Sequence, residues 1–232
     1  MILVKTLFKI IIVILIFCIS IGVFAIGSGY DMYKEALENK PLSQKIEEIK
    51  SNKNYTTIDK LPKIYLNAVV AVEDHRFYNH PGIDIIAIGR AFINDIKQMK
   101  LVEGGSTITQ QLAKNIYFTQ EKSFIRKIAE VFMAFNIERN YTKDEILELY
   151  VNTSYFGDGY NNVREASLGY FNKEPEELND YESTMLAGIP NSPSNYSPTK
   201  NPELAKERQK QVLDKMIKYG YLTQGEANKI SN

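Results

Sequence analysis

The sequence has a single cysteine, Cys18, among its 232 residues. Cys18 lies in an apolar N-terminal stretch, so the rest of the chain has no cysteine for a disulfide bond and must be stabilised by packing. The sequence also lacks an excess of either charge, because 28 Lys and Arg balance 28 Asp and Glu. A formal net charge of zero gives no electrostatic reason to expect a nucleic acid as partner. Internal repeats and low-complexity tracts are not evident either.

One long apolar run is present, at the N-terminus. Residues 7–27 contain one charged side chain, Lys9, and are long enough to cross a bilayer as a single helix. Lys5 and Lys9 precede the apolar body whereas Asp31 follows it, which places residues 1–6 in the cytoplasm and the rest of the chain outside. A cleaved signal peptide is the alternative, but 24–29 matches a small-residue cleavage site only loosely. We therefore expect an uncleaved membrane anchor.

The remaining sequence predicts a tether followed by one mainly α-helical domain. Residues 28–60 are polar and charged and suggest a tether with one short helix at 42–51, and residues 61–232 suit a single domain. Strand signals are few and short. Apolar spacing, capping patterns and prolines predict helices from about residue 64, then at 85–99, 123–139, from Thr142–Glu145 onward, at 161–171, 175–187, 202–219 and 223–232, with a proline-punctuated loop at 189–198.

The most informative segment follows the apolar run 68–72, where Glu73 and Asp74 stand side by side. A carboxylate at the end of a buried segment is desolvated on one side, which raises its pKa and suits it to general acid-base catalysis near neutral pH. The plain alternative is a capping acid at Glu73 with Asp74 in a surface salt bridge. His75 and His80 follow, but their spacing matches no common zinc pattern, so we do not expect a zinc site.

A glycine-rich helix start follows at residues 104–115. Gly104 and Gly105 free the backbone for close approach of a ligand, and Ser106 or Thr107 can cap the helix. The exposed amide hydrogens at such a helix start bind anions. The first turns then carry side chains suited to sugar hydroxyls and phosphate oxygens, namely Gln110, Gln111, Lys114 and Asn115. A simple helix cap is the alternative, and the glycine spacing excludes a nucleotide P-loop.

Glu130 is the third candidate. Arg126 and Lys127 precede it by one helical turn, so the three side chains share a helix face. In one interpretation they form an exposed ion pair that contributes about 0.2–0.5 kcal/mol. In the other they form a basic-acidic cluster in which Glu130 orients cations, or a metal ion, against a phosphate.

Five segments, in this order, resemble the peptidoglycan glycosyltransferase family, which is the transglycosylase module of bifunctional penicillin-binding proteins and of membrane-anchored monofunctional enzymes. The matching segments lie between about residues 61 and 216 and are 73–82, 104–115, 126–130, 146–157 and 182–198. The resemblance implies a mainly α, lysozyme-like fold with two lobes, a head and a membrane-proximal jaw. Residues 85–99 and 116–118 fit the jaw, where their apolar side chains could meet lipid; core packing is the alternative for them.

The resemblance also implies an activity and a set of roles. The activity is polymerisation of lipid II into β-1,4-linked glycan strands, with inversion and release of undecaprenyl pyrophosphate. Glu73 would be the general base that deprotonates the acceptor 4-hydroxyl. Glu130 would assist at the pyrophosphate or at its divalent cation, Mg²⁺ or Mn²⁺, with no organic cofactor. The basic positions that would neutralise the departing diphosphate are Lys114, Arg126 and Lys127. The donor-side wall would be formed by Ser106, Thr107, Gln110, Gln111 and Asn115, and structural support by Asp74, Phe77, His80, Gly104, Gly105, Asn152 and Gly157.

The sequence departs from the family pattern at Asn162, where the family usually has a glycine. Asn tolerates left-handed φ better than most residues, so we expect the turn to survive. The chain also stops at Asn232 without a transpeptidase domain, so the resemblance implies an enzyme that polymerises glycan strands and does not cross-link them.

The expected partners are lipid II, the growing glycan strand and membrane lipid, with transpeptidases or cell-division proteins as further candidates. Two other functions stay open: a catalytically weak scaffold that binds lipid II or cell-division proteins, and a lysozyme-like enzyme that cleaves glycan. The presence of both Glu73 and Glu130 speaks against the scaffold. Cleavage needs no contacts to a lipid phosphate, so Lys114, Arg126 and Lys127 speak against the cleaving enzyme.

Overall fold

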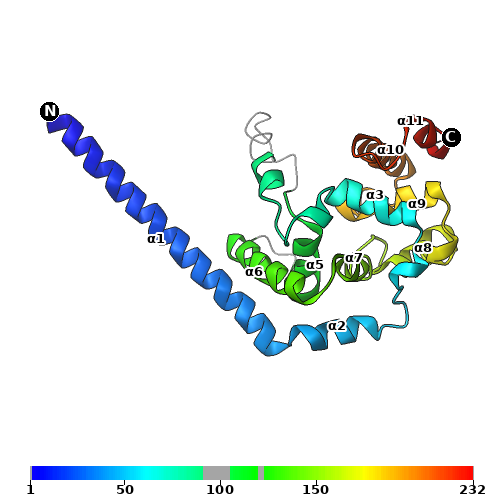
Figure 1. Ribbon diagram of the computed structural model, residues 1–232, viewed down its shortest axis with the longest axis horizontal. Helices are drawn as coiled ribbons and strands as arrows, with labels where there is room; N and C mark the ends of the chain where they lie inside the picture. The colour runs from blue at the N-terminus through cyan, green and yellow to red at the C-terminus, as the bar shows by residue number, and fades with distance from the viewer. Residues whose placement is uncertain (1, 91–104, 120–122, 232) are drawn as a thin grey trace.

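The computed structural model describes residues 2–90, 105–119 and 123–231 (Figure 1). Every regular element within these ranges is a helix, which confirms the mainly α class. In chain order the elements are α1 (Ile2–Asn39), α2 (Leu42–Lys50), η1 (Ile58–Lys60), α3 (Lys63–Glu73), η2 (Phe77–Asn79), a helical segment at 85–90, α5 (Ile108–Tyr117), α6 (Phe124–Asn140), α7 (Lys143–Val151), α8 (Val163–Phe171), η3 (Pro175–Glu177), α9 (Asp180–Gly188), η4 (Ile189–Asn191), α10 (Pro202–Lys218) and α11 (Gln224–Ser231), where η marks a 3₁₀ helix.

The N-terminal apolar run forms the first part of α1, which projects away from the helices that follow it (Figure 1). Its large apolar side chains are exposed, from Leu7 at 59% to Ile26 at 54%. The part of α1 from Lys9 to Asn39 is long and apolar enough to cross a membrane. A helix of this kind near the N-terminus fits a membrane anchor or a signal sequence.

The second part of α1 runs through the first residues of the predicted tether. Residues 28–39 stay helical, and α1 packs on α6. Tyr30 and Tyr33 both contact Phe132 of α6, with ring centroids 5.2 and 6.0 Å apart. The polar composition of this segment concealed one apolar face, and burial of that face against α6 keeps the helix formed. Only the short helix α2 was predicted here.

The main core lies around α3, which packs against α9 and α10, while α5 packs against α6 and α7. The apolar run 68–71 of α3 is buried, as the sequence predicts. Large aromatic side chains fill the space between these helices: Tyr65, Phe77, Tyr150 and Phe156 are each at most 2% exposed. The core thereby fixes the end of α3, where Glu73 lies.

Several helix starts follow the predicted capping patterns. Thr107 caps α5 in a capping box with Gln110, and Thr142 caps α7 in a capping box with Glu145. Each threonine accepts the backbone N–H three residues later, and each longer side chain accepts the N–H of its threonine in return. The observed bounds of α6, α8, α10 and α11 also lie close to the predicted ones.

One helix prediction in the C-terminal half is wrong, and Asn162 has a different conformation from the one considered in the sequence analysis. The helix predicted at 175–187 is broken into η3 and α9, because the Asn179 side chain accepts the N–H of Glu182 and starts a new helix. Asn162 is not left-handed: its φ is −155°, and its side chain caps α8 by accepting the N–H of Glu165. Asn serves this N-cap position well, so glycine is not needed there.

The two segments assigned to a jaw lie in different settings. Residues 85–90 are helical, with Ile85 and Ile86 74% and 60% exposed, whereas the predicted remainder at 91–99 lies outside the described residues. Ile116 is buried, and Tyr117 and Phe118 pack against the main core. The side chains of 116–118 are therefore used in core packing.

Gly157 and Gly159 offer a matched test of close packing at one turn. Both have left-handed φ, +83° and +88°. A Cβ at Gly157 would lie 2.7 Å from the Pro193 carbonyl oxygen, whereas a Cβ at Gly159 would meet nothing within 4 Å. Both alanine variants carry the left-handed strain, and Gly157→Ala adds overpacking. The free energy of unfolding of Gly157→Ala should therefore be about 1–3 kcal/mol lower than that of Gly159→Ala. Denaturant unfolding in detergent measures this, and equal losses would contradict the close approach.

Candidate active site

Glu73 ends α3 with its carboxylate enclosed by side chains from three other helices. Gln111 of α5 donates from Nε2 to Glu73 Oε2 at 2.9 Å, and Tyr150 of α7 donates to Gln111 Oε1 at 3.3 Å. At the other oxygen, Arg208 Nη2 of α10 lies 4.0 Å from Glu73 Oε1. Glu73 Oε1 is buried and accepts no hydrogen bond within the described chain. The carboxylate is thus oriented through one oxygen and left unbonded at the other.

Burial raises the pKa of Glu73 above that of an ordinary glutamate. The hydrogen bond from Gln111 and the positive charges of Arg208 and Lys114 act in the opposite direction, and the neighbouring Asp74 adds to the rise. Desolvation of the charged form outweighs these effects. The sequence predicts this shift from the position of Glu73 at the end of a buried run.

Glu130 of α6 is 1% exposed and has basic side chains at both oxygens. Lys127 Nζ lies 2.9 Å from Oε2, and Arg126 Nη1 lies 3.4 Å from Oε1. Lys127 Nζ also donates to Ser106 Oγ at 2.6 Å, which joins α6 to the residues before α5. Burial of Glu130 excludes the exposed ion pair that sequence alone left open.

Lys114 of α5 is the cation shared by the two acids. Burial lowers its pKa, the charges of Glu130 and Glu73 raise it, and those of Arg126 and Lys127 lower it. Its ammonium group makes no hydrogen bond or ion pair within the described residues. The arrangement therefore holds a basic side chain near both carboxylates and available to an anionic ligand.

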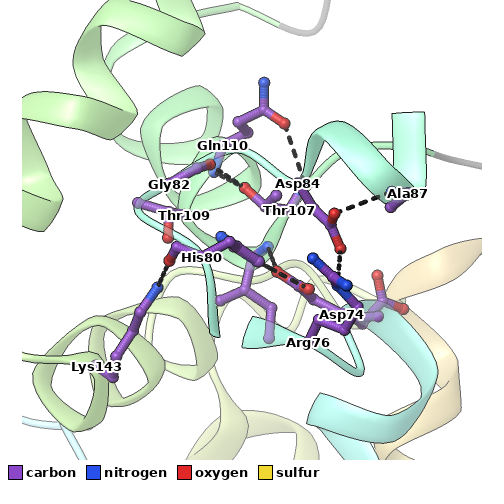
Figure 2. A network of polar contacts seen from close by, with 12 residues as sticks. Asp74, Arg76, His80, Gly82, Asp84, Ala87, Thr107, Thr109, Gln110 and Lys143 are labelled. Carbon is purple, nitrogen blue, oxygen red and sulfur yellow. Dashed lines mark hydrogen bonds and ion pairs between the residues drawn. The ribbon is translucent and has the colours of Figure 1, made fainter. Parts of the chain in front are cut away.

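A buried polar network fixes the segment after α3 to the start of α5 (Figure 2). His80 Nε2 lies 2.9 Å from Asp74 Oδ2, and the same oxygen accepts the backbone N–H of Ile108 at 3.1 Å. Thr107 Oγ1 donates to the carbonyl oxygen of Gly82 at 2.6 Å. These bonds hold Glu73 and α5 in one relative position.

Asp74, His80 and Asp84 lie close enough together to hold a metal ion. The carboxylate oxygens of the two aspartates already accept hydrogen bonds. Asp84 accepts from Arg76 Nε and from the Ala87 N–H, each at 2.9 Å (Figure 2). Asp74 is paired with His80 as described above. The cluster therefore serves the fold.

The two histidines in this region point to different partners. His75 stacks on Tyr219 of α10, with ring centroids 4.0 Å apart, whereas His80 is buried against Asp74. The His80 ring also meets Phe77 edge-on at 6.4 Å. No shared ligand set forms between His75 and His80 in the described part of the chain.

The other predicted site residues are placed as follows. Thr107 and Gln110 are buried in the capping box of α5, and Asn115 is partly exposed on the same helix. Asn152 exchanges hydrogen bonds with the backbone of Thr56, accepting and donating at 2.8 Å. Gly105 is partly exposed, and Gly104 lies outside the described residues. The structure brings together Glu73, Gln111, Lys114, Arg126, Lys127, Glu130 and Ser106, and the assigned roles stay predictions.

The family model described as Transglycosylase matches residues 39–217. This chain belongs to the transglycosylase family. Penicillin-binding protein 1F of Bacillus subtilis (strain 168) is 47% identical over 193 residues, covering 82% of this chain and 27% of the relative. Penicillin-binding protein 1A of Aquifex aeolicus (strain VF5) is 46% identical over 169 residues, covering 73% of this chain and 23% of the relative. The transglycosylase chain therefore spans about a quarter of the length of these relatives.

Among solved structures, the crystal structure of penicillin-binding protein 1A from Haemophilus influenzae is similar to this chain at a TM-score of 0.46 and 20% identity. The matched region covers 77% of this chain and 17% of the chain in that crystal structure.

Sequence reasoning missed Arg208, the cation beside Glu73 in this transglycosylase chain. It lies in a run of charged residues in which Lys206 and Lys210 look equivalent. The available signal was helical spacing: Arg208 is one turn from the buried Ala205 and Val212, so its side chain starts on the inward face of α10. Tyr150 lies within the matching segment 146–157, and the sequence alone gives it no role.

The raised pKa of Glu73 predicts how Glu73→Gln changes stability with pH. The folded protein holds this proton more tightly than the unfolded chain, so the stability from Glu73 is full below the ordinary carboxyl pKa and is lost as pH rises through the raised value. The Gln variant should therefore match the wild type near about pH 4 and melt at a higher temperature than it near pH 8. The control is Glu203→Gln, an acid with 85% exposure. A melting-temperature difference independent of pH would contradict the prediction.

Proposed function

We propose that this chain polymerises lipid II into β-1,4-linked glycan strands of peptidoglycan by inverting transfer, with release of undecaprenyl pyrophosphate. The observation that carries the proposal is the pair of buried acids, Glu73 and Glu130, with Lys114 near both. One acid has the environment of a base, and the other is surrounded by basic side chains suited to a phosphate. Membership of the transglycosylase family supports the same assignment.

Glu73 acts as the general base in this proposal. Its carboxylate takes the proton of the acceptor 4-hydroxyl as that oxygen forms a bond to the anomeric carbon of the donor. The bond from the anomeric carbon to the diphosphate oxygen breaks on the opposite face, and the diphosphate leaves with the bonding electron pair. A carboxyl whose pKa is raised by burial is suited to this transfer near neutral pH. Gln111 orients the carboxylate through its hydrogen bond, and Tyr150 orients Gln111 in turn.

The basic residues stabilise the charge that develops on the diphosphate. The Lys114 ammonium makes no hydrogen bond or ion pair in the described part of the chain, and Arg126 Nε is buried there without a hydrogen-bond acceptor. Lys127 is held in place by Glu130 and Ser106. Preorganised donors of this kind lose little energy to reorganisation when the leaving group becomes charged.

A divalent cation, Mg²⁺ or Mn²⁺, fits this site together with the substrate phosphates. Glu130 Oε1 accepts no hydrogen bond within the described residues and offers a single ligand atom. Mg²⁺ commonly binds through one or two carboxylates plus phosphate oxygens and water. When bound, the ion would neutralise charge on the diphosphate, and Glu130 would hold it. The proposal involves no organic cofactor.

The long helix α1 supports a membrane location for this activity. As an anchor it would confine the chain and its lipid-linked substrate to one surface, which raises their effective concentration. With Lys5 and Lys9 at its start and Asp31 after it, such an anchor would put the proposed catalytic residues on the extracytoplasmic side. Exposed Ile85 and Ile86 would then face lipid. Transpeptidases or cell-division proteins are the proposed protein partners.

The assay that tests the function uses the detergent-solubilised chain with labelled lipid II and Mg²⁺. Long strands that lysozyme digests are expected. Glu73→Gln should lower the polymerisation rate by about 10²–10⁴-fold, the usual contribution of a general base, while lipid II binding persists. Glu203→Gln is the matched control, because it removes an exposed acid. Near-normal turnover of Glu73→Gln would remove Glu73 as the base.

The same assay separates the other functions. Shortening of preformed glycan would identify a cleaving enzyme, and binding of lipid II without turnover by the wild type would identify a scaffold. Either result would overturn the proposal.

Lys114→Ala tests the diphosphate contact. We expect the rate to fall by about 10²-fold, as on removal of one charge-stabilising donor, with little change in melting temperature. Lys210→Ala, at an exposed position of α10, is the control. An unchanged rate combined with a lowered melting temperature would assign Lys114 to the fold instead.

A further inference from the structure

Arg208 reaches Glu73 from α10, at the carboxylate oxygen that Gln111 does not contact. Its Nη2 atom lies 4.0 Å from Glu73 Oε1, and its side chain is 12% exposed. Within the described residues, no other cation lies within ion-pair distance of Glu73. The Arg208–Glu73 pair is thus a mostly buried contact at the base of the proposed reaction.

Three contacts hold the Arg208 guanidinium in this position. Its Nε donates to the carbonyl oxygen of Gly188 at 3.2 Å, and its Nη1 donates to Gln211 Oε1 at 3.0 Å. The group also lies over the Tyr196 ring, 5.6 Å from the centroid. With Nε and Nη1 engaged elsewhere, Nη2 is the nitrogen directed at Glu73.

The path of Arg208 depends on the absence of a side chain at Gly188. A Cβ at Gly188 would lie 2.9 Å from Arg208 Cγ and 3.2 Å from Val212 Cγ2. The Cγ atom is near the root of the Arg208 side chain, so the whole group would have to move. The sequence of α9 therefore makes room for Arg208 to pass.

The two oxygens of Glu73 are held in different ways. Oε2 accepts a neutral hydrogen bond from Gln111, which Tyr150 fixes in turn. Oε1 is buried, accepts no hydrogen bond in the described chain, and has Arg208 as its nearest cation. A buried charge without compensation is strongly unfavourable, so the cation at Oε1 decides whether the ionised carboxylate is tolerated.

We propose that Arg208 is the counter-ion of Glu73, a positioning residue that keeps the buried carboxylate ionised and in place without forming a hydrogen bond to it; this inference rests on the proposed role of Glu73 as the base. The separation matters, because a direct bidentate bond would hold the carboxylate too firmly in its charged form. A cation at 4.0 Å offsets part of the burial and leaves the oxygen able to accept a proton.

Other charged or titratable groups also face Glu73, from each helix packed around it. They are Lys114 of α5, Asp74 at the end of α3 and the hydroxyl of Tyr150 of α7. Lys114 favours the ionised form as Arg208 does, but the diphosphate would engage Lys114 when substrate is bound. Arg208, whose one ion-pair partner among the described acids is Glu73, would then remain as the counter-ion.

The first experiment measures polymerisation of lipid II against pH for the wild type and Arg208→Met, which keeps an unbranched apolar stem and removes the charge. Loss of the counter-ion should move the acidic limb of the pH–rate profile upward by about one pH unit. At a pH below the limb, the variant should then be about tenfold slower than the wild type, and at high pH the two rates should be similar. Arg208→Lys should move the limb less. A rate lowered equally at every pH, or an unmoved limb, would overturn the proposal.

Gly188→Ala and Lys210→Met supply the matched variants. Gly188→Ala displaces Arg208 without removing its charge, so the acidic limb should move in the same direction. Lys210→Met removes an exposed cation from the same helix and should leave the limb unmoved. These variants and Arg208→Lys also keep the test decisive if Arg208→Met fails to fold. An unmoved limb in Gly188→Ala would count against the pair.

A second experiment needs no substrate. Glu73→Gln should raise the melting temperature at pH 8 more in the Arg208→Met background than in the wild type, because the buried carboxylate lacks its counter-ion there. The two backgrounds should converge near about pH 4, where the acid is protonated. Equal gains in both backgrounds would overturn the Arg208–Glu73 coupling. A wild-type chain that fails to polymerise lipid II would instead overturn only the proposed function.

Discussion

The carboxylate of Asp74 joins the end of α3 to the start of α5, and the geometry of the site depends on this joint. Asp74 accepts the first backbone N–H of α5, at Ile108, while pairing with His80. A negative charge at a helix N-terminus is favourable, because it meets the unpaired amide hydrogens and the positive end of the helix dipole. α3 carries Glu73, and α5 carries Gln111 and Lys114. One buried contact thus sets the relative position of the proposed base, its orienting amide and the shared cation.

The two acids occupy different electrostatic environments although both are buried. Glu73 has a neutral hydrogen-bond donor at one oxygen and a cation at 4.0 Å from the other. Glu130 has a lysine at 2.9 Å and an arginine at 3.4 Å. Environments of this kind push two carboxyl groups toward different tasks in one site. The distribution of cations, rather than the residue type, distinguishes the proposed base from the proposed phosphate-side acid.

Local patterns predicted much of the fold because the physics they report is local. The capping boxes at Thr107 and Thr142 and the burial of Glu73 after its apolar run follow from short segments of sequence. The helical continuation through residues 28–39 did not follow, since it depends on α6 packing against aromatic residues of α1. The break at Asn179 was missed because its side chain competes with the backbone hydrogen bonds of a continuous helix.

The candidate site was predictable in its residues and not in their pairing. Motif resemblance indicated Glu73, Lys114 and Glu130. Which of these charged side chains interact electrostatically depends on how α3, α5 and α6 pack. Arg208 is the one arginine of α10 among several lysines, and helical spacing puts it near the buried face without showing that it reaches Glu73. Its role depends on a contact across α9 at Gly188, which no spacing rule within α10 encodes.

Because α1 is one continuous helix, it fixes the distance between the bilayer and the residues of the proposed active site. The apolar run ends near Ile26, and Tyr30, which touches α6 at Phe132, follows at a helical rise of about 6 Å. With α1 as the anchor, the helix that bears Glu130 therefore contacts α1 close to the edge of the acyl region, at the depth of lipid headgroups. A lipid-linked diphosphate emerges from the membrane at that depth, so the leaving group could be received without being lifted from its own leaflet.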